Sequence, residues 1–334
     1  MTQPLTELQQ KTLSIIPHIT GTMSILGATS IMYDILSDWK EKLNSPYYRI
    51  LLVISCVDLS SSFWLGLSTW PVPRGTANVY GAVGTTASCS AQGFFSQLNL
   101  LGPLYNLNLA LYYLLLGKYH LTDEEISERY ERYMHPISLT IGIVFAIAGL
   151  PLTLYNNANL WCWIAPYPAG CEDNNGQHGD VPCERGHDAW LYRWLFFYCP
   201  LWIIIVTVTV ILIMLIRSAV SDERRFIALQ KETRSKRPST RLIETASSTD
   251  DIPVPPAPVD MNETHRYERS RQTFRQAMFY LGVFYLTWVF QTVNRLYQLI
   301  TGDSVFILLV LHTIFAPLHG FFNFIVYRHG QITV

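Results

Sequence analysis

The stretch LWIIIVTVTVILIMLI (residues 201–216) decides the fold, because no charged side chain interrupts it between Pro200 and Arg217. With its apolar flank back to residue 191, it is long enough to cross the ~30 Å hydrocarbon core of a bilayer as a helix. The whole chain agrees, since its 334 residues are 49% hydrophobic and only 15% charged, whereas soluble domains average about 25% charged residues. The sequence therefore predicts a membrane protein and argues against a soluble enzyme. The formal net charge of -1 gives no sign of nucleic-acid binding.

Further apolar runs lie on both sides of this one. We expect membrane spans at residues 13–36, 50–70, 89–117, 137–155, 191–216, 274–300 and 304–327. The predicted fold class is therefore an all-α membrane protein, a seven-transmembrane helix bundle. Its parts would be a short extracellular tail (1–12), helices one to five with their loops (13–216), a partly disordered third cytoplasmic loop (217–273), helices six and seven (274–327) and a short cytoplasmic tail (328–334).

Lysine and arginine predict the orientation. They gather in the loops 37–49, 118–136 and 217–273, whereas the opposite loops hold only Arg74 and Arg185. Basic loops stay in the cytoplasm, so we expect the N-terminus outside, the C-terminus inside and a multi-pass protein of the plasma membrane. In the third basic loop, residues 217–236 and 262–275 read as helical continuations around a Ser/Thr-rich and Pro-rich middle (239–258). These helical ends could dock a partner protein, or their basic residues could only bind anionic lipid and set topology.

The cysteines fit the same topology. Cys89, Cys162, Cys171 and Cys183 all fall at or beyond the predicted outer face, where oxidation is possible. We expect one disulfide between Cys89 and Cys162 and another between Cys171 and Cys183. The rival pairings of Cys89 with Cys171 or Cys183 remain open at this stage.

Three motifs carry a family resemblance. Trp161-Cys162-Trp163-Ile164 resembles the CW loop that cAMP-receptor-like and secretin-like receptors share. Residues 105–113 (YNLNLALYY) resemble the inner half of the third helix of cAMP-receptor-like proteins, and residues 317–327 (PLHGFFNFIVY) closely resemble the end of their seventh helix. With the predicted layout, the resemblance to cAMP-receptor-like (class E type) G-protein-coupled receptors covers most of the chain. It implies signalling through a heterotrimeric G protein and does not fix the ligand.

One set of residues is expected to form a conformational switch. Asp58 is the only acid in the second predicted span, and a charge at mid-membrane costs about 2.5–3.5 kcal/mol on insertion scales, so it must face the interior. We expect it to pack near Asn323, as a switch or as a structural hydrogen-bonded carboxyl. Pro317 supplies a weak point in the seventh helix. The candidate switch residues are Asp58, Asn106, Pro317, Asn323 and Tyr327.

The outer half of the predicted bundle carries the candidate ligand residues. They are Gln92, Ser96, Asn99, Trp163, Trp288, Gln291, Arg295 and His312. Those of the third span recur at helical spacing with Pro103, which should kink that helix; interhelical hydrogen bonding is the alternative reading. Arg295 could anchor an anionic ligand with its guanidinium fork or extend to lipid headgroups. His312 could instead be an interior hydrogen-bonded histidine. We expect no metal site and no cofactor.

These expectations combine into a receptor for a small molecule or short peptide that acts on a heterotrimeric G protein in the cytoplasm. The alternative is a membrane transporter of a small polar solute, although the sequence has no repeated halves. A retinal-binding light sensor needs a lysine in the seventh span, and no lysine follows Lys236. No nucleophile–base motif or phosphate-binding loop suggests an enzyme.

Overall fold

The computed structural model describes residues 5–168, 170–172, 177, 179, 181–235, 261–301 and 305–332. The elements are α1 (Glu7–Ser37), α2 (Trp39–Lys42), α3 (Pro46–Gly66), α4 (Thr86–Leu98), α5 (Leu101–Gly117), α6 (Asp123–Ile126), η1 (Ser127–Glu131), α7 (Arg132–Ala148), β1 (Tyr155–Asn157), β2 (Cys162–Ile164), α8 (Ala189–Arg193), η2 (Trp194–Tyr198), α9 (Cys199–Ser235), α10 (Met261–Thr301), α11 (Phe306–Phe315) and α12 (His319–Ile332). Here η marks a π-helical turn. The middle of the third basic loop, residues 236–260, lies outside the described residues.

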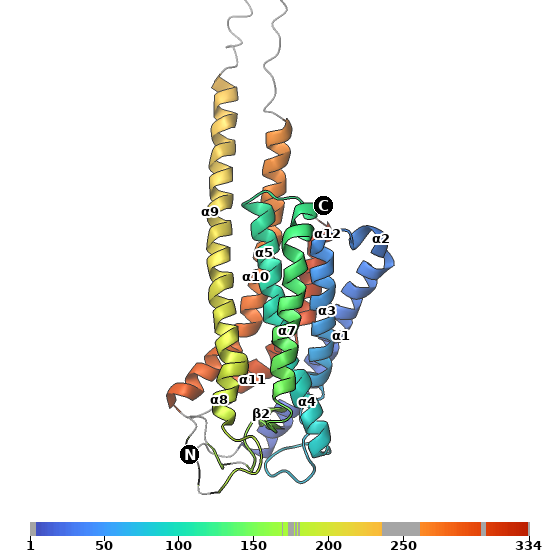
Figure 1. Cartoon of the computed structure of the whole chain (residues 1–334), viewed down its shortest axis with the longest axis vertical. Helices are drawn as coiled ribbons and strands as arrows, with labels where there is room; N and C mark the ends of the chain where they lie inside the picture. The colour runs from blue at the N-terminus through green and yellow to red at the C-terminus, as the bar shows by residue number, and fades with distance from the viewer. Residues whose placement is uncertain are drawn as a thin grey trace, which may run out of the picture.

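The molecule is an elongated bundle of long helices (Figure 1). The hairpin of β1 and β2 and the start of α8 lie at one end, which we call the hairpin end, and α2 lies at the opposite end. At that opposite end α9 and α10 project beyond the other helices. The expected helical continuations on both sides of the third basic loop are therefore present, since α9 runs on to Ser235 and α10 begins at Met261.

Length and hydropathy identify several of these helices as able to cross a membrane. Within the described residues, four segments qualify: Glu7–Ser37, Pro46–Gly66, Thr86–Gly117 and Ala189–Glu232. The bent pair of α11 and α12 makes a fifth if it counts as one span. On α9, Ile203 and Val206 are 62% and 63% exposed. Large apolar side chains this exposed suit a helix that faces lipid.

Two interruptions of helices, a break and a bend, lie close to prolines. A helical proline cannot donate to the carbonyl four residues earlier. Pro103 leaves the Asn99 carbonyl without that donor, and the amide of Gly102 donates to it instead at 3.0 Å in a tighter turn. The expected kink is thus a break at residues 99–100, one turn before the proline. The bend, of 51°, falls between α11 and α12 around Pro317, where a weak point was expected.

Some predicted boundaries were wrong. The first helix begins at Glu7 rather than near residue 13, because Thr6 forms a capping box with Gln9. The fourth was expected to continue to residue 155, but α7 ends at Ala148 and Tyr155 lies in β1. Leu154 and Tyr155 are buried in a cluster with Ile164 of β2, whereas Leu150 and Leu152 are exposed. Periodicity alone did not distinguish this arrangement from a continued span.

Small residues let α1 approach its neighbours closely. A Cβ atom added to Gly21 would lie 2.8 Å from the carbonyl oxygen of Ser62 on α3. One added to Gly27 would lie 2.7 Å from the carbonyl oxygen of Gly320 on α12. Close backbone packing of this kind is typical of helices that associate in a membrane, where small side chains line the interface.

Candidate functional site: a polar and aromatic interior

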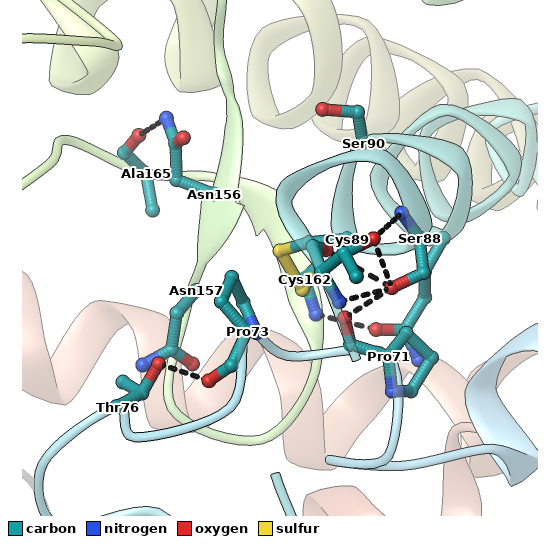
Figure 2. The surroundings of a disulfide bond; sticks show 12 residues. Pro71, Pro73, Thr76, Ser88, Cys89, Ser90, Asn156, Asn157, Cys162 and Ala165 are labelled. Carbon is teal, nitrogen blue, oxygen red and sulfur yellow. Dashed lines mark hydrogen bonds between the residues drawn. A yellow bond between two sulfur atoms is a disulfide. The ribbon is translucent and has the colours of Figure 1, made fainter. Parts of the chain in front are cut away.

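The hairpin is fixed to the bundle by a disulfide (Figure 2). Cys89 on α4 is bonded to Cys162 on β2, and Cys171 is bonded to Cys183. Both expected pairings are confirmed, and the rival pairings are excluded. The side chain of Gln92 strengthens this junction, since its Oε1 accepts from the amide of Cys162 at 2.8 Å. Its Nε2 donates at 2.8 Å to two carbonyl oxygens near the end of α3.

Next to the hairpin, aromatic side chains from three segments meet. The ring of Trp163 on β2 packs edge-on against Phe197 and Tyr198 of η2, at centroid distances of 5.0 and 5.8 Å. Phe197 in turn lies 6.0 Å from Trp288 on α10. The guanidinium of Arg295 lies over the ring of Tyr198 at 5.1 Å, a favourable cation–π arrangement. Three candidate ligand residues, Trp163, Trp288 and Arg295, are thus brought together around η2.

Gln97 holds this cluster in place, although the sequence analysis did not select it. Pro200 cannot donate to the carbonyl of Phe196, and the Nε2 of Gln97 donates to that oxygen at 2.9 Å. The Oε1 of Gln97 accepts from the indole Nε1 of Trp163 at 2.9 Å. One buried amide therefore joins α4, η2 and the hairpin. The signal that could have found it is a proline that frees a carbonyl opposite a polar helix face.

The other candidate ligand residues occupy separate places. The hydroxyl of Ser96 is buried without a partner, and Asn99 lies at the break between α4 and α5. The Nε2 of Gln291 lies 3.5 Å from the carbonyl oxygen of Thr287 on its own helix. The ring of His312 packs edge-on against Trp161 at 5.3 Å, and its Nδ1 is buried without a partner.

Deeper in the bundle, the expected pair of polar residues is in contact. The side-chain amide of Asn323 on α12 donates to the carboxylate of Asp58 on α3 at 2.7 Å, and both residues are buried. Nearby, the hydroxyl of Ser62 donates to the carbonyl of Pro317 at 2.9 Å. That carbonyl lies at the bend between α11 and α12. The contact between Asp58 and Asn323 therefore lies next to the bend around Pro317.

Of the two remaining candidate switch residues, Asn106 bonds within its own helix and Tyr327 bonds to another helix. The amide of Asn106 donates to the carbonyl of Gly102 on its own helix at 2.9 Å. The hydroxyl of Tyr327 donates to the carboxylate of Asp34, which also pairs with Lys42 at 2.6 Å. Tyr327 therefore ties the end of α12 to α1 and α2.

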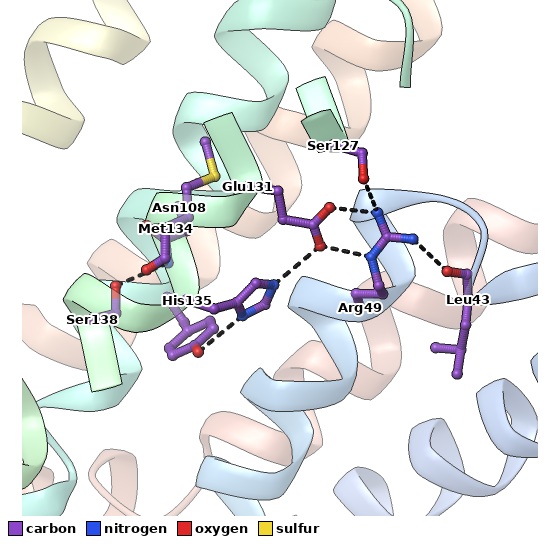
Figure 3. Close-up of polar contacts among 9 residues, drawn as sticks. Leu43, Arg49, Asn108, Ser127, Glu131, Met134, His135 and Ser138 are labelled. Carbon is purple, nitrogen blue, oxygen red and sulfur yellow. Dashed lines mark hydrogen bonds and ion pairs between the residues drawn. The ribbon is translucent and has the colours of Figure 1, made fainter. Parts of the chain in front are cut away.

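A further polar network lies near the α2 end and was missed by the sequence analysis (Figure 3). Arg49 on α3 pairs with the buried carboxylate of Glu131 in η1, through two hydrogen bonds, of which that from Nε is 2.7 Å. The Nε2 of His135 lies 3.1 Å from the same carboxylate, and its Nδ1 lies 3.0 Å from the hydroxyl of Tyr105 on α5. Three helices are joined here. Burial alone would raise the pKa of Glu131, but hydrogen bonds from Arg49 and His135 hold that pKa at about 2.

None of these groups of polar side chains resembles a metal site. In the part of the chain that the structure describes, no group of three or more His, Cys, Asp or Glu side chains could hold a metal ion. What the interior offers instead is hydrogen-bond donors and aromatic faces in the half near the hairpin. A carboxylate–amide pair follows in the middle, and an ion-pair network lies near α2.

The arrangement is similar to that of a known receptor. The crystal structure of squid rhodopsin matches with a TM-score of 0.60 and 13% sequence identity, over 99% of this chain and 87% of that chain. No family profile matches the sequence, and no curated protein matches it. At this identity the likeness establishes the fold alone. The chain has a fold like that of squid rhodopsin, and several of its described helices are long and apolar enough to cross a membrane.

Proposed function

We propose that the chain is a G-protein-coupled receptor of the cAMP-receptor-like type that passes an extracellular small-molecule or short-peptide signal to a heterotrimeric G protein. The observation that carries this proposal is the likeness of 99% of the chain to a receptor fold. In this proposal seven helices cross the plasma membrane, with the hairpin end outside and the α2 end in the cytoplasm.

The distribution of polar groups supports a receptor. Near the hairpin end, Trp163, Trp288 and Arg295 converge and would contact a ligand from outside. In the middle, Asp58 and Asn323 join α3 to α12 beside the bend at Pro317. A contact beside a bend can have two arrangements, and a ligand that prefers one of them shifts the population.

The projecting ends of α9 and α10 suit the G-protein partner. Both helices continue beyond the rest of the bundle at the α2 end (Figure 1). The exposed basic side chains there include Arg224, Arg225 and Arg271. A basic surface in the cytoplasm also attracts anionic lipid, so both roles belong to the proposal. The likeness to squid rhodopsin supports a receptor and does not favour the transporter alternative.

The test is nucleotide exchange on a panel of purified G proteins with the purified full chain. Replacing Asp58 with Asn keeps the shape and removes the charge, so we expect exchange to change severalfold while the Tm in detergent changes little. The control is Asp38→Asn, because the carboxylate of Asp38 is 65% exposed and lies 3.6 Å from Lys42. Unchanged exchange together with a lower Tm would show that Asp58 is only structural. Solute uptake into vesicles without G protein would favour a transporter.

A further inference from the structure

Two buried arginines from sequence-distant helices lie near the hairpin end. Arg193 closes α8 and is 8% exposed, and Arg295 on α10 is 6% exposed. The positive charge of Arg295 acts unfavourably on Arg193. From the sequence, only Arg295 was expected to be a possible anchor for an anionic ligand, because Arg193 lies in a segment whose other residues are mostly aromatic.

Neither guanidinium has a carboxylate partner among the described residues. Arg295 donates one hydrogen bond, from Nη1 to the Oε1 of Gln298 at 3.1 Å, and its Nε is buried without a partner. Arg193 makes no hydrogen bond to any described residue, and its Nε is likewise buried and unpartnered there. Among the described acids, the one whose charge acts on Arg193 is Glu172. Its two oxygens accept from the amides of Ala189 and Trp190 at 3.0 and 3.1 Å, at the start of α8.

Such an arrangement is unfavourable without an anion. A buried charge needs a hydrogen-bonded counter-charge. Two buried positive charges that repel one another need a negative counter-charge even more than a single one does. Water does not solvate these charges fully, because Arg193 and Arg295 are 8% and 6% exposed. Arginine presents its donors in a planar fork that matches carboxylate and phosphate oxygens. The unpartnered Nε atoms are donors of this kind.

The surroundings indicate what the anion is attached to. Tyr198 lies under Arg295 and against Trp163, and Trp194 lies 5.5 Å from Tyr198. The indole Nε1 of Trp194 is buried without a partner and adds another donor. Aromatic faces next to a pair of cations suit a ligand with an apolar or aromatic body and one acidic group.

We propose that Arg193 and Arg295 form a binding site for the carboxylate or phosphate group of a small amphipathic ligand. The site deepens the receptor function proposed above, since it lies among the residues assigned to the ligand. Its test requires no G protein, so the two proposals can fail separately.

The experiment uses the purified full chain in phosphatidylcholine nanodiscs. Tm is measured against increasing phenyl phosphate or phenylacetate, with uncharged phenylacetamide as the control ligand. We expect both anions, and not the amide, to raise Tm. In Arg193→Gln and Arg295→Gln the half-maximal concentration should rise at least about tenfold, since charge-assisted hydrogen bonds contribute about 1.5–3 kcal/mol each. Arg74→Gln is the matched control, because Arg74 is exposed in the first loop on the same side.

A second measurement separates binding from folding. Without any anion, each arginine-to-glutamine change relieves like-charge repulsion and should leave Tm unchanged or raise it, whereas loss of a structural contact would lower it. Lower Tm values in both variants, with no stabilisation of the original chain by either anion, would overturn the proposal. Stabilisation by phosphatidylglycerol alone, lost in both variants, would support the anion site and assign its phosphate to lipid rather than to a soluble ligand.

Discussion

Replacing Glu131 with Gln should destabilise the α2 end of the bundle. The carboxylate of Glu131 holds Arg49 of α3, and it lies 3.1 Å from His135, whose other nitrogen contacts Tyr105 of α5. The substitution keeps the shape of the side chain but removes the charge. Arg49 then retains the carbonyl of Leu43 and the hydroxyl of Ser127 as acceptors.

The magnitude follows from burial. Removing one partner of a fully buried ion pair costs about 3–5 kcal/mol. The side chain of Glu131 is 7% exposed, but that of Arg49 is 28% exposed, so water replaces part of the loss and about 2–3 kcal/mol is expected. The pKa of Glu131 gives a consistent figure. Lowering it from the ordinary 4.5 to about 2 corresponds to about 3 kcal/mol at 1.36 kcal/mol per pKa unit.

The assay is the Tm of the purified full chain in detergent at several pH values. Because folding lowers the pKa of Glu131, its stabilising effect is complete above pH 4.5 and is lost as the pH falls towards 2. The original chain and Glu131→Gln should therefore differ by a constant amount between pH 7 and pH 5.5, on the order of 4–8 °C. The control Glu128→Gln changes an exposed acid of the same π-helical turn and should leave Tm unchanged.

Two results would refute this reasoning. One is a Tm difference that already disappears by pH 6, because the carboxyl would then titrate far above the value that its hydrogen bonds require. The other is an equal loss for Glu128→Gln, which would show that the turn tolerates no substitution. The double variant Arg49→Gln with Glu131→Gln should lose less stability than the sum of the single variants, since each single change already breaks the same pair.

Two further predictions concern the disulfide and the packing of α1. Cys162→Ala should make Cys89 available to a thiol reagent after denaturation and cost about 4 kcal/mol, because the bond closes a loop of 73 residues; no additional labelling would contradict the pairing. Gly27→Ala should cost about 1–3 kcal/mol, because its new Cβ would lie 2.7 Å from the backbone of Gly320. The control Gly282→Ala meets nothing within 4 Å and should be neutral or slightly stabilising; equal losses in both would show that close packing is not the cause.

Much of the helical layout could be predicted from the sequence, because apolar runs and prolines act locally. The run at residues 201–216 lies within α9, and the weak point at Pro317 is a 51° bend. The disulfides followed from topology, since the four cysteines that were expected outside are the four that pair. Where the prediction failed, as at Tyr155, an apolar segment had more than one way to become buried.

The polar centres were harder to predict, since each depends on partners distant in sequence. Asp58 was identified because an acid inside a span must have an interior partner. Glu131 gave no such signal, because an acid in a charged loop is ordinarily solvated. Arg193 was overlooked among aromatic residues, and its significance appears only in the packed bundle, where the charge of Arg295 on α10 acts on it. No acid of the described residues forms an ion pair with either arginine. Pairings between helices are a property of the packed bundle rather than of any one segment.

The proposed anion site and the proposed switch are connected by continuous contacts through α10. Arg295 and Trp288 are seven residues apart and so share a face of that helix. The ring of Trp288 stacks on His319 of α12 at 5.5 Å, one turn before Asn323, which binds Asp58. Further along, the hydroxyl of Tyr280 on α10 lies 2.9 Å from that of Tyr47 on α3.

Helix α10 is therefore held at three levels, by η2 near the hairpin, by α12 in the middle and by α3 near the α2 end. An anion that draws Arg193 and Arg295 together acts on the first of these contacts. If α10 moves as a rigid rod, the buried hydrogen bond between Tyr47 and Tyr280 must break, at a net cost of about 0.5–1.5 kcal/mol. A ligand that favours the moved state by more than this amount can shift the population. The hydrogen bond between Tyr47 and Tyr280 is thus weak enough for one charge-assisted contact to offset.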